Sequence, residues 1–184
     1  MFMQRNLPRL DPSFYAGKAY VFWTHTTEDR GRFELNDSFH FRFREILTHV
    51  CFRYQLVTPA YCIMPDHVHL LWIGYADDAD QKQATRFFRK ELRSVIAPCV
   101  WQRQPHEHVV REQERKSGIY ADTIRYILNN PVRADLAERW QDYAFIGSML
   151  PGYPHIDLRQ RDFRELFWKV YQKLAEAADA GKSK

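Results

Sequence analysis

The sequence predicts an α+β domain: an antiparallel sheet in βαββαβ order with helices on one face, then a further helix and a C-terminal helical extension. Three observations predict it. Short runs rich in β-branched and aromatic residues alternate with longer segments whose apolar residues recur at helical spacing. A Pro-Asp turn inside an apolar run predicts a hairpin. With 45% apolar residues, the 184-residue chain can bury one proper core.

The first strand is expected at residues 19–26, after a polar, proline-containing lead-in. A Gly-, Asp- and Asn-containing segment follows. Asp37 or Ser38 can then cap a helix whose apolar stripe runs from Phe39 to Val50. This helix should cover one face of the sheet.

The next elements are two strands split by a turn at Pro65 and Asp66. A second amphipathic helix carries an apolar stripe over residues 84–96, and Pro98 is expected to end it. Another strand is predicted within residues 101–111. This order of elements is typical of the ferredoxin-like arrangement.

A third helix is predicted over residues 112–130, because Pro131 disfavours helical geometry at the residue before it. A short helical stretch at 133–140 and a last helix with a stripe over 163–174 complete the chain. We therefore divide the chain into a lead-in, a principal domain and an extension, at residues 1–18, 19–140 and 141–184.

Composition indicates the cellular environment of the protein more clearly than its binding partner. A formal charge of +4 suits a polyanion without requiring one. The cysteines at 51, 62 and 99 are odd in number and far apart, so we expect neither disulfides nor a cysteine zinc site, and a reducing cytoplasm fits best. No apolar run is long enough to predict a signal peptide or a membrane anchor.

Two histidines interrupt the apolar hairpin. His67 and His69 are separated by one residue, so on a strand they share a face while Val68 points away. They form a ready pair of metal ligands. The alternative is two polar residues on the wet face of a half-buried strand. Only a third ligand and a nucleophile elsewhere would favour the metal site.

Tyr126 and Asn130 supply such groups, since residues four apart share a helix face. A phenol and an amide oxygen are thereby presented together near a helix end. Taken alone, Tyr126 is an ordinary core or interface tyrosine and Asn130 an ordinary C-terminal helix residue. Their combination with the histidine pair makes the functional interpretation stronger.

The motif Met-Pro-Asp-His-Val-His at 64–69, followed by Tyr-Ile-Leu-Asn-Asn-Pro-Val-Arg-Ala at 126–134, resembles the REP-associated tyrosine transposases. Trp-Gln-Arg at 101–103 and His-Val-Val-Arg at 108–111 extend the resemblance, which spans roughly residues 19–140. These proteins are similar to the insertion sequence 200-like transposases, within the HUH single-strand endonucleases.

The resemblance implies roles residue by residue. His67, His69 and Asn130 would bind Mg²⁺ or Mn²⁺, and Tyr126 would be the nucleophile of the catalytic helix. Tyrosine attack on a phosphodiester gives a covalent 5′-phosphotyrosine and a free 3′-OH. The implied substrate is single-stranded DNA with REP-like hairpins. The active unit is a monomer or a homodimer, and we expect Tyr126 to reach the histidines within one chain.

Basic residues provide candidate DNA contacts. The polar face of the second helix is either solvated or contacts phosphates, and the resemblance favours the second interpretation. His108 and Arg111 lie in a family-like run, although Glu107 stands where aspartate is usual, and their role is structural or DNA-contacting. The candidate DNA-binding residues are Lys82, Arg86, Arg89, Lys90, Arg93, His108, Arg111 and Arg133.

Three other interpretations compete. A histidine-triad nucleotide hydrolase would need a third histidine where Leu71 stands. A domesticated hairpin-binding protein would keep the fold and lose cleavage. A purely structural ferredoxin-like domain leaves the combined motifs unexplained. The remaining histidines have no comparable context and are interpreted as surface or core residues: His25, His40, His49, His106 and His155.

Overall fold

The computed structural model describes residues 10–116 and 118–181, so residues 1–9 of the expected lead-in lie outside the described residues. Its centre is a five-stranded antiparallel sheet of order β4-β1-β3-β2-β5. The strands are β1 (Tyr20–Thr26), β2 (Leu56–Met64), β3 (His67–Gly74), β4 (His106–Val109) and β5 (Ile146–Met149). The first four give the predicted ferredoxin-like sheet.

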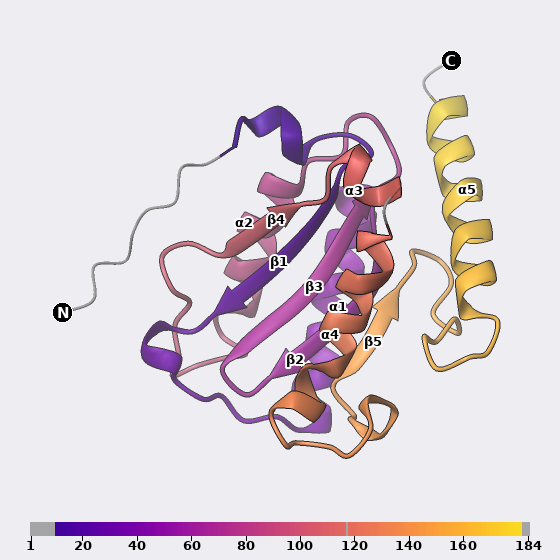
Figure 1. Cartoon of the computed structure of the whole chain (residues 1–184). Helices are drawn as coiled ribbons and strands as arrows, with labels where there is room; N and C mark the ends of the chain where they lie inside the picture. Colours follow the sequence, from indigo (N-terminus) through magenta and orange to yellow (C-terminus); the bar gives the residue numbers. More distant parts are fainter. Residues whose placement is uncertain (1–9, 117, 182–184) are drawn as a thin grey trace.

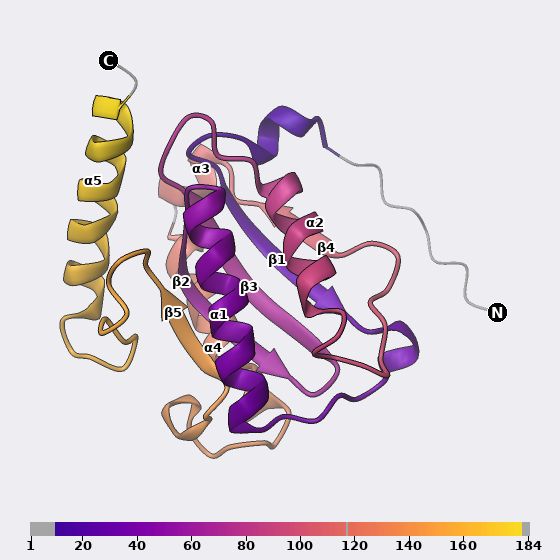
Figure 2. The ribbon, with the colours of Figure 1, turned by 180° about the vertical axis from the view of Figure 1, so that it is seen from behind.

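The helices lie in two layers. Figure 2 shows α1 (Asp37–Arg53) and α2 (Gln81–Leu92) side by side on one face of the sheet. Figure 1 shows α4 (Ile119–Arg133) on the opposite face, beside the short α3 (Glu112–Lys116). The last helix, α5 (Phe163–Gly181), stands at the β5 side of the molecule. Short 3-10 turns complete the elements: Pro12–Tyr15, Glu28–Arg30 and Trp140–Asp142.

Strand alternation divides the core between the two faces. In β3, Val68, Leu70 and Trp72 pack with α1 and α2. Leu71 and Ile73 point the other way and pack with residues of α4 and α5. Each fully buried large apolar side chain stabilises the fold by about 1.5–3 kcal/mol. The sheet is therefore packed against an apolar core on both faces.

The hairpin between β2 and β3 has the register that its turn predicts. Met64 pairs with His67 and Cys62 pairs with His69, so Pro65 and Asp66 form the tight connection. The backbone carbonyl of Asp66 accepts hydrogen bonds from the amide and the hydroxyl of Thr27. This ties the turn to the segment after β1.

Several predicted boundaries were wrong. Asn36, not Asp37 or Ser38, caps α1 by accepting a hydrogen bond from Phe39. Helix α2 ends at Leu92 instead of continuing toward Pro98; the chain goes on in turns that still bury Ile96, so the apolar spacing looks unbroken. Within the predicted strand over 101–111, only β4 is extended.

The later part of the chain differs more. Gly118, at φ +90°, separates α3 from α4, where one helix was predicted. Helix α4 runs through Pro131 to Arg133, and turns with one short 3-10 helix replace the predicted helix over 133–140. Strand β5 was not predicted: it pairs with β2 and gives that strand a neighbour on both edges.

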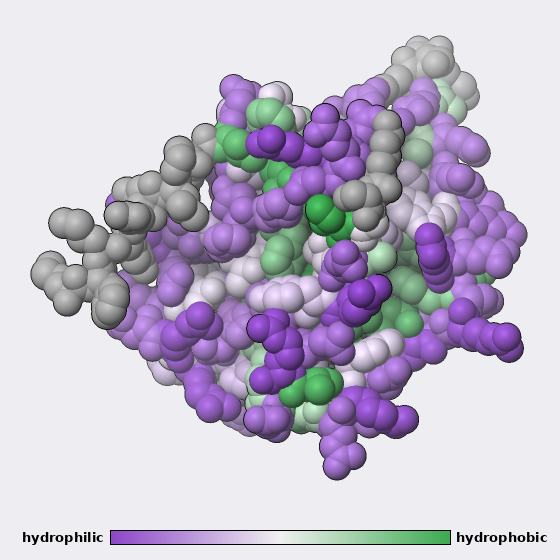
Figure 3. Space-filling view, viewed as in Figure 1, coloured by the Kyte–Doolittle hydropathy of each residue, from purple (hydrophilic) through white to green (hydrophobic). Residues whose placement is uncertain are grey.

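Other features agree with the composition. Cys51, Cys62 and Cys99 are free thiols. None of the helices in the described ranges combines the length and apolar character needed to span a bilayer. Figure 3 shows that hydrophilic side chains cover most of the face that carries α4, with smaller hydrophobic areas between α4 and α5.

Candidate active site

The two histidines of β3 lie together at the hairpin end of the sheet, under α4. Their Nε2 atoms are 3.1 Å apart and their rings meet edge to face. The His67 side chain is 15% exposed and His69 is 5% exposed. The interpretation as a wet strand face was therefore wrong: this pair is covered.

The other ring nitrogens of the pair are held by oxygen atoms. Asp66 Oδ1 lies 2.5 Å from Nδ1 of His67, and Thr24 Oγ1 lies 3.0 Å from Nδ1 of His69. Arg30 in turn donates to Asp66 Oδ2 at 3.2 Å. Partners on Nδ1 fix a histidine ring and leave Nε2 for a ligand, as in metal sites. Thr24, Arg30 and the side chain of Asp66 are functional candidates that the sequence did not single out.

Electrostatics keeps His69 neutral and Asp66 charged. Burial, reinforced by the charge of His67, lowers the pKa of His69 to about 3, although a hydrogen bond with Asn130 acts in the opposite direction. Burial acts to raise the pKa of Asp66, but hydrogen bonds from His67 and Arg30 outweigh it and lower that pKa. A neutral imidazole has the lone pair that a metal ligand needs.

Asn130 joins the histidines from α4. It is 9% exposed, and besides the His69 contact its Nδ2 donates to the carbonyl of Tyr126 at 2.8 Å and to that of Ile127 at 3.4 Å. Proline has no N–H for the Ile127 carbonyl. The Asn130 amide therefore supplies a donor where Pro131 removes one. This explains why the prediction that the helix ends at Asn130 was wrong, and it leaves Oδ1 as the atom available to a ligand.

Tyr126 lies beside the same histidine. Its ring centroid is 5.6 Å from that of His69 and 5.8 Å from that of Phe22, and the Arg133 guanidinium carbon is 5.2 Å from the ring centre. The residue is 43% exposed, so a substrate can reach the phenol. One chain thus brings Tyr126 to the histidine pair, as expected for a site assembled in cis.

The donor set fits a divalent ion of mixed nitrogen and oxygen ligation. Two adjacent ligands of an octahedral ion with bonds of about 2.1 Å are about 3.0 Å apart, which matches the 3.1 Å between the Nε2 atoms. In the described part of the chain, no three histidine, cysteine or carboxylate side chains form a metal cluster. A metal here would therefore need the amide oxygen of Asn130.

The candidate DNA-binding residues fall into three groups. Arg133 lies at Tyr126, on the α4 face. The α2 residues lie on the opposite face: Arg86, Lys90 and Arg93 are exposed, whereas Lys82 pairs with Glu107 at 3.7 Å and Arg89 turns inward. His108 pairs with Glu114 at 3.4 Å, next to the exposed Arg111 at the start of α3. The structure thus does not bring the α2 group to the histidines.

The five other histidines lie in the core or at the surface, as predicted. His25 is fully buried among aromatic rings, and His40 contacts Tyr61 at 2.9 Å. His49, His106 and His155 are exposed.

Comparison with known proteins tests the family. A Haemophilus influenzae protein assigned to the REP-associated tyrosine transposases is 29% identical over 147 residues, covering 72% of this chain and 80% of that protein. The solved structure of a REP-associated tyrosine transposase bound to a REP hairpin matches with a TM-score of 0.63 at 22% identity, over 78% of this chain and 82% of the other. The chain resembles the REP-associated tyrosine transposases in sequence and in fold.

The resemblance inferred from the motifs is therefore confirmed, although no family model matches the sequence. The REP-associated tyrosine transposase structure also supports the mixed sheet-and-helix fold.

Proposed function

We propose that the protein is a metal-dependent single-strand DNA endonuclease and strand transferase of the single-tyrosine type, acting on hairpins of REP type. The observation that carries the proposal is the placement of the Tyr126 ring 5.6 Å from His69, within the chain that also supplies His67 and Asn130. A structural domain has no need to gather these four side chains. The hairpin substrate is suggested by the solved relative, which is bound to a REP hairpin.

The chemistry assigned to Tyr126 is attack on a phosphodiester. Its phenol oxygen forms a bond to phosphorus while the bond from phosphorus to O3′ breaks. The phenol proton passes to solvent, which reaches the exposed ring, and the leaving 3′ oxygen takes up a proton. The products are a 5′-phosphotyrosine and a free 3′-OH. The bond energy is retained in the phosphotyrosine, so a second 3′-OH can be joined without ATP.

The surrounding residues orient the reacting groups. His67, His69 and Asn130 would hold Mg²⁺ or Mn²⁺, which when bound polarises the scissile phosphate and offsets its developing charge. Phe22 contacts both the Tyr126 and the His69 rings and fixes their relative position. Arg133, beside the Tyr126 ring, is placed to pair with a phosphate oxygen of the bound strand.

The test uses labelled single-stranded oligonucleotides that carry hairpins from the source genome, with Mg²⁺ or Mn²⁺. We expect an adduct that survives denaturation and disappears when His67 and His69 are both replaced by alanine. Because His69 is buried, circular dichroism must show that the double variant is folded. Hairpin binding without an adduct in either metal would show instead that the protein is a domesticated binding module.

Two further properties belong to this proposal. A monomer suffices for cleavage, because Tyr126 and the histidines belong to one chain; sedimentation of the active complex tests this. The free thiols of Cys51, Cys62 and Cys99 suit a reducing cytoplasm. Fractionation of cells that express the tagged protein tests the location.

A further inference from the structure

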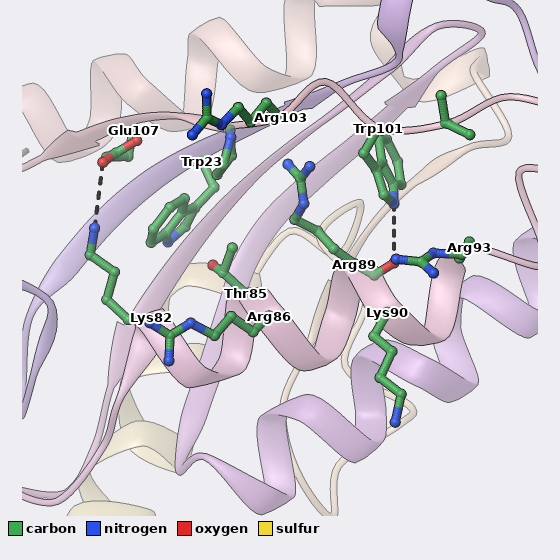
Figure 4. A pocket seen from close by; sticks show the side chains of 12 residues that line it. Trp23, Lys82, Thr85, Arg86, Arg89, Lys90, Arg93, Trp101, Arg103 and Glu107 are labelled. Carbon is green, nitrogen blue, oxygen red and sulfur yellow. Dashed lines mark hydrogen bonds and ion pairs between the residues drawn. The ribbon is translucent and has the colours of Figure 1, made fainter. Parts of the chain in front are cut away.

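A pocket of about 520 Å³ lies on the sheet face opposite Tyr126, between α2, the edge strand β4 and the segment before it (Figure 4). Among the described residues that line it, Glu107 is the single carboxylate, and it pairs with Lys82 at 3.7 Å. The other charged residues that line the pocket are Arg86, Arg89, Lys90, Arg93 and Arg103. The pocket therefore has a large excess of positive charge.

Arg89 differs from its neighbours on α2. Figure 4 shows its side chain directed between Trp23 and Trp101, whereas Lys90 points away from the strands. Its Nη2 donates to the carbonyl of Gln102, and its Nη1 is buried without a hydrogen-bond partner. Within the described ranges, no carboxylate forms an ion pair with Arg89. Burial lowers the pKa of Arg89 to about 10, which still leaves it charged at neutral pH.

Removing a cation from water without supplying an anion is unfavourable. Arg89 is partly buried, and the Gln102 carbonyl and the Trp101 ring replace only part of its hydration, since Nη1 keeps no partner. Exposed Lys90 and Arg93 avoid this penalty through hydration. Thr85, one helical turn before Arg89, adds a second unsatisfied group: it is 6% exposed and its hydroxyl has no partner. The floor of the pocket thus offers two donors that lack an acceptor, and phosphate oxygens are the acceptors that an arginine fork matches.

Beside Arg89 and Thr85, the pocket is lined by the apolar side chains of Trp101 and Val100. Trp101 is held by a hydrogen bond from its indole nitrogen to the carbonyl of Arg89, at 3.2 Å, and Val100 beside it is 51% exposed. An aromatic ring and an aliphatic side chain next to a phosphate site suit a nucleobase. The volume lies within the usual range for a small-ligand site.

We propose that this pocket binds one unpaired nucleotide of the DNA strand, with its phosphate on Arg89 and Thr85 and its base against Trp101 and Val100. The inference rests on the proposed function for the identity of the polymer. An unpaired nucleotide can turn its phosphate inward, whereas the backbone of a duplex presents phosphates to a broad surface. Arg89 is then the anchor, and the exposed basic residues of α2 contribute general attraction.

The test is a titration of the full chain with thymidine 5′-monophosphate, thymidine or inorganic phosphate, followed by NMR through the Trp101 indole N–H signal. We expect the monophosphate to bind more tightly than either fragment. Arg89→Met should weaken its binding at least about tenfold, the loss expected for a charged hydrogen bond. The matched control Lys90→Met removes one exposed charge from the same helix and should change affinity less than about threefold. Arg89→Lys keeps the positive charge but lacks the planar guanidinium, so its affinity for the monophosphate should lie between those of Arg89→Met and Lys90→Met.

Thermal unfolding provides a second measurement. Arg89→Met removes a partly buried cation that has no anionic partner among the described residues, so thermal unfolding of the free variant should occur at or above the temperature of the unmodified protein. The inference would be overturned if Arg89→Met and Lys90→Met lost the same affinity for the monophosphate, or if thymidine bound as tightly as its monophosphate. The mononucleotide titration requires no cleavage. If no adduct forms but the monophosphate still binds in an Arg89-dependent way, the proposed function is refuted and the nucleotide pocket stands. If the adduct forms but the monophosphate does not bind in an Arg89-dependent way, the nucleotide pocket is refuted and the proposed function stands.

Discussion

Thr24→Val tests whether the strand next to β3 prepares the histidines for a metal. Thr24 Oγ1 is 3.0 Å from Nδ1 of His69, and valine has nearly the same shape without the hydroxyl. Losing a hydrogen bond of this kind lowers the free energy of unfolding by about 0.5–1.5 kcal/mol. Loss of a partner behind a metal-binding histidine weakens metal affinity by roughly 10–100-fold, or about 1.4–2.7 kcal/mol.

The assay is calorimetric titration of the full chain with Mn²⁺, alongside urea unfolding of the same samples. Thr26→Val is the matched control, because Thr26 lies opposite His67 on the same strand and its hydroxyl makes no hydrogen bond to either described ring. Thr24→Ser should restore most of the affinity. A dissociation constant for Thr24→Val equal to that of the unmodified protein would refute the argument that Thr24 positions His69.

Three other predictions concern stability and metal. His25 is fully buried, and its burial, with the nearby charge of Arg89, keeps its pKa well below the ordinary value. The unfolded state therefore binds a proton that the folded state does not, and the free energy of unfolding should fall by about 2 kcal/mol from about pH 7.5 to about pH 5. In urea unfolding, His25→Phe should remove this part of the slope; an unchanged slope would contradict it. Asn130→Ala should lower the free energy of unfolding by about 1–3 kcal/mol, because the buried carbonyl of Ile127 and the part-buried carbonyl of Tyr126 lose the side-chain donor of Asn130. The double variant Asn130→Ala with Pro131→Ala regains a backbone N–H for the Ile127 carbonyl, so urea unfolding should show that part of the stability returns. The adduct should not return; if it did, Asn130 would act only by supporting the helix. Chelation of divalent ions should abolish the adduct while hairpin binding, measured by gel shift, persists; an adduct that survives chelation would exclude a metal-dependent reaction.

The local patterns of the chain were enough to predict the sheet that carries the site. The alternation around His67 and His69 defined their shared face, and the turn at Pro65 defined the hairpin register. Helical spacing predicted that Tyr126 and Asn130 share a face, whereas their roles as nucleophile and ligand were implied by the family resemblance. These inferences hold because each depends on residues close in sequence, where backbone geometry fixes direction.

What the sequence missed depends on pairing between distant segments. Thr24 meets His69 only because β1 pairs with β3 in one register, and no local pattern gives that register. Strand β5 is four residues long and contains glycine and serine, so it lacks the alternation of a strand. Its existence is implied by β2, which is buried along its whole length.

Pro131 shows a different reason for failure. A proline normally ends a helix at the preceding residue, but here the Asn130 side chain donates to the carbonyls of Tyr126 and Ile127 and the helix continues. Arg89 could not be separated from Lys90 by spacing alone, because its inward direction depends on the segment around Gln102. In both cases a side chain bonds to a backbone carbonyl, and sequence spacing alone does not predict that bond.

The most direct test of the central claim is to locate the covalent bond. The protein is incubated with a cleavable hairpin oligonucleotide and Mn²⁺, digested with trypsin, and the peptide that carries the nucleotide is sequenced by mass spectrometry. We predict a phosphotyrosyl bond at Tyr126 and no adduct from Tyr126→Phe. The phenylalanine ring should keep the contacts with His69 and Phe22, and hairpin affinity should be unchanged. An adduct on another residue, or an undiminished adduct in Tyr126→Phe, would contradict this prediction.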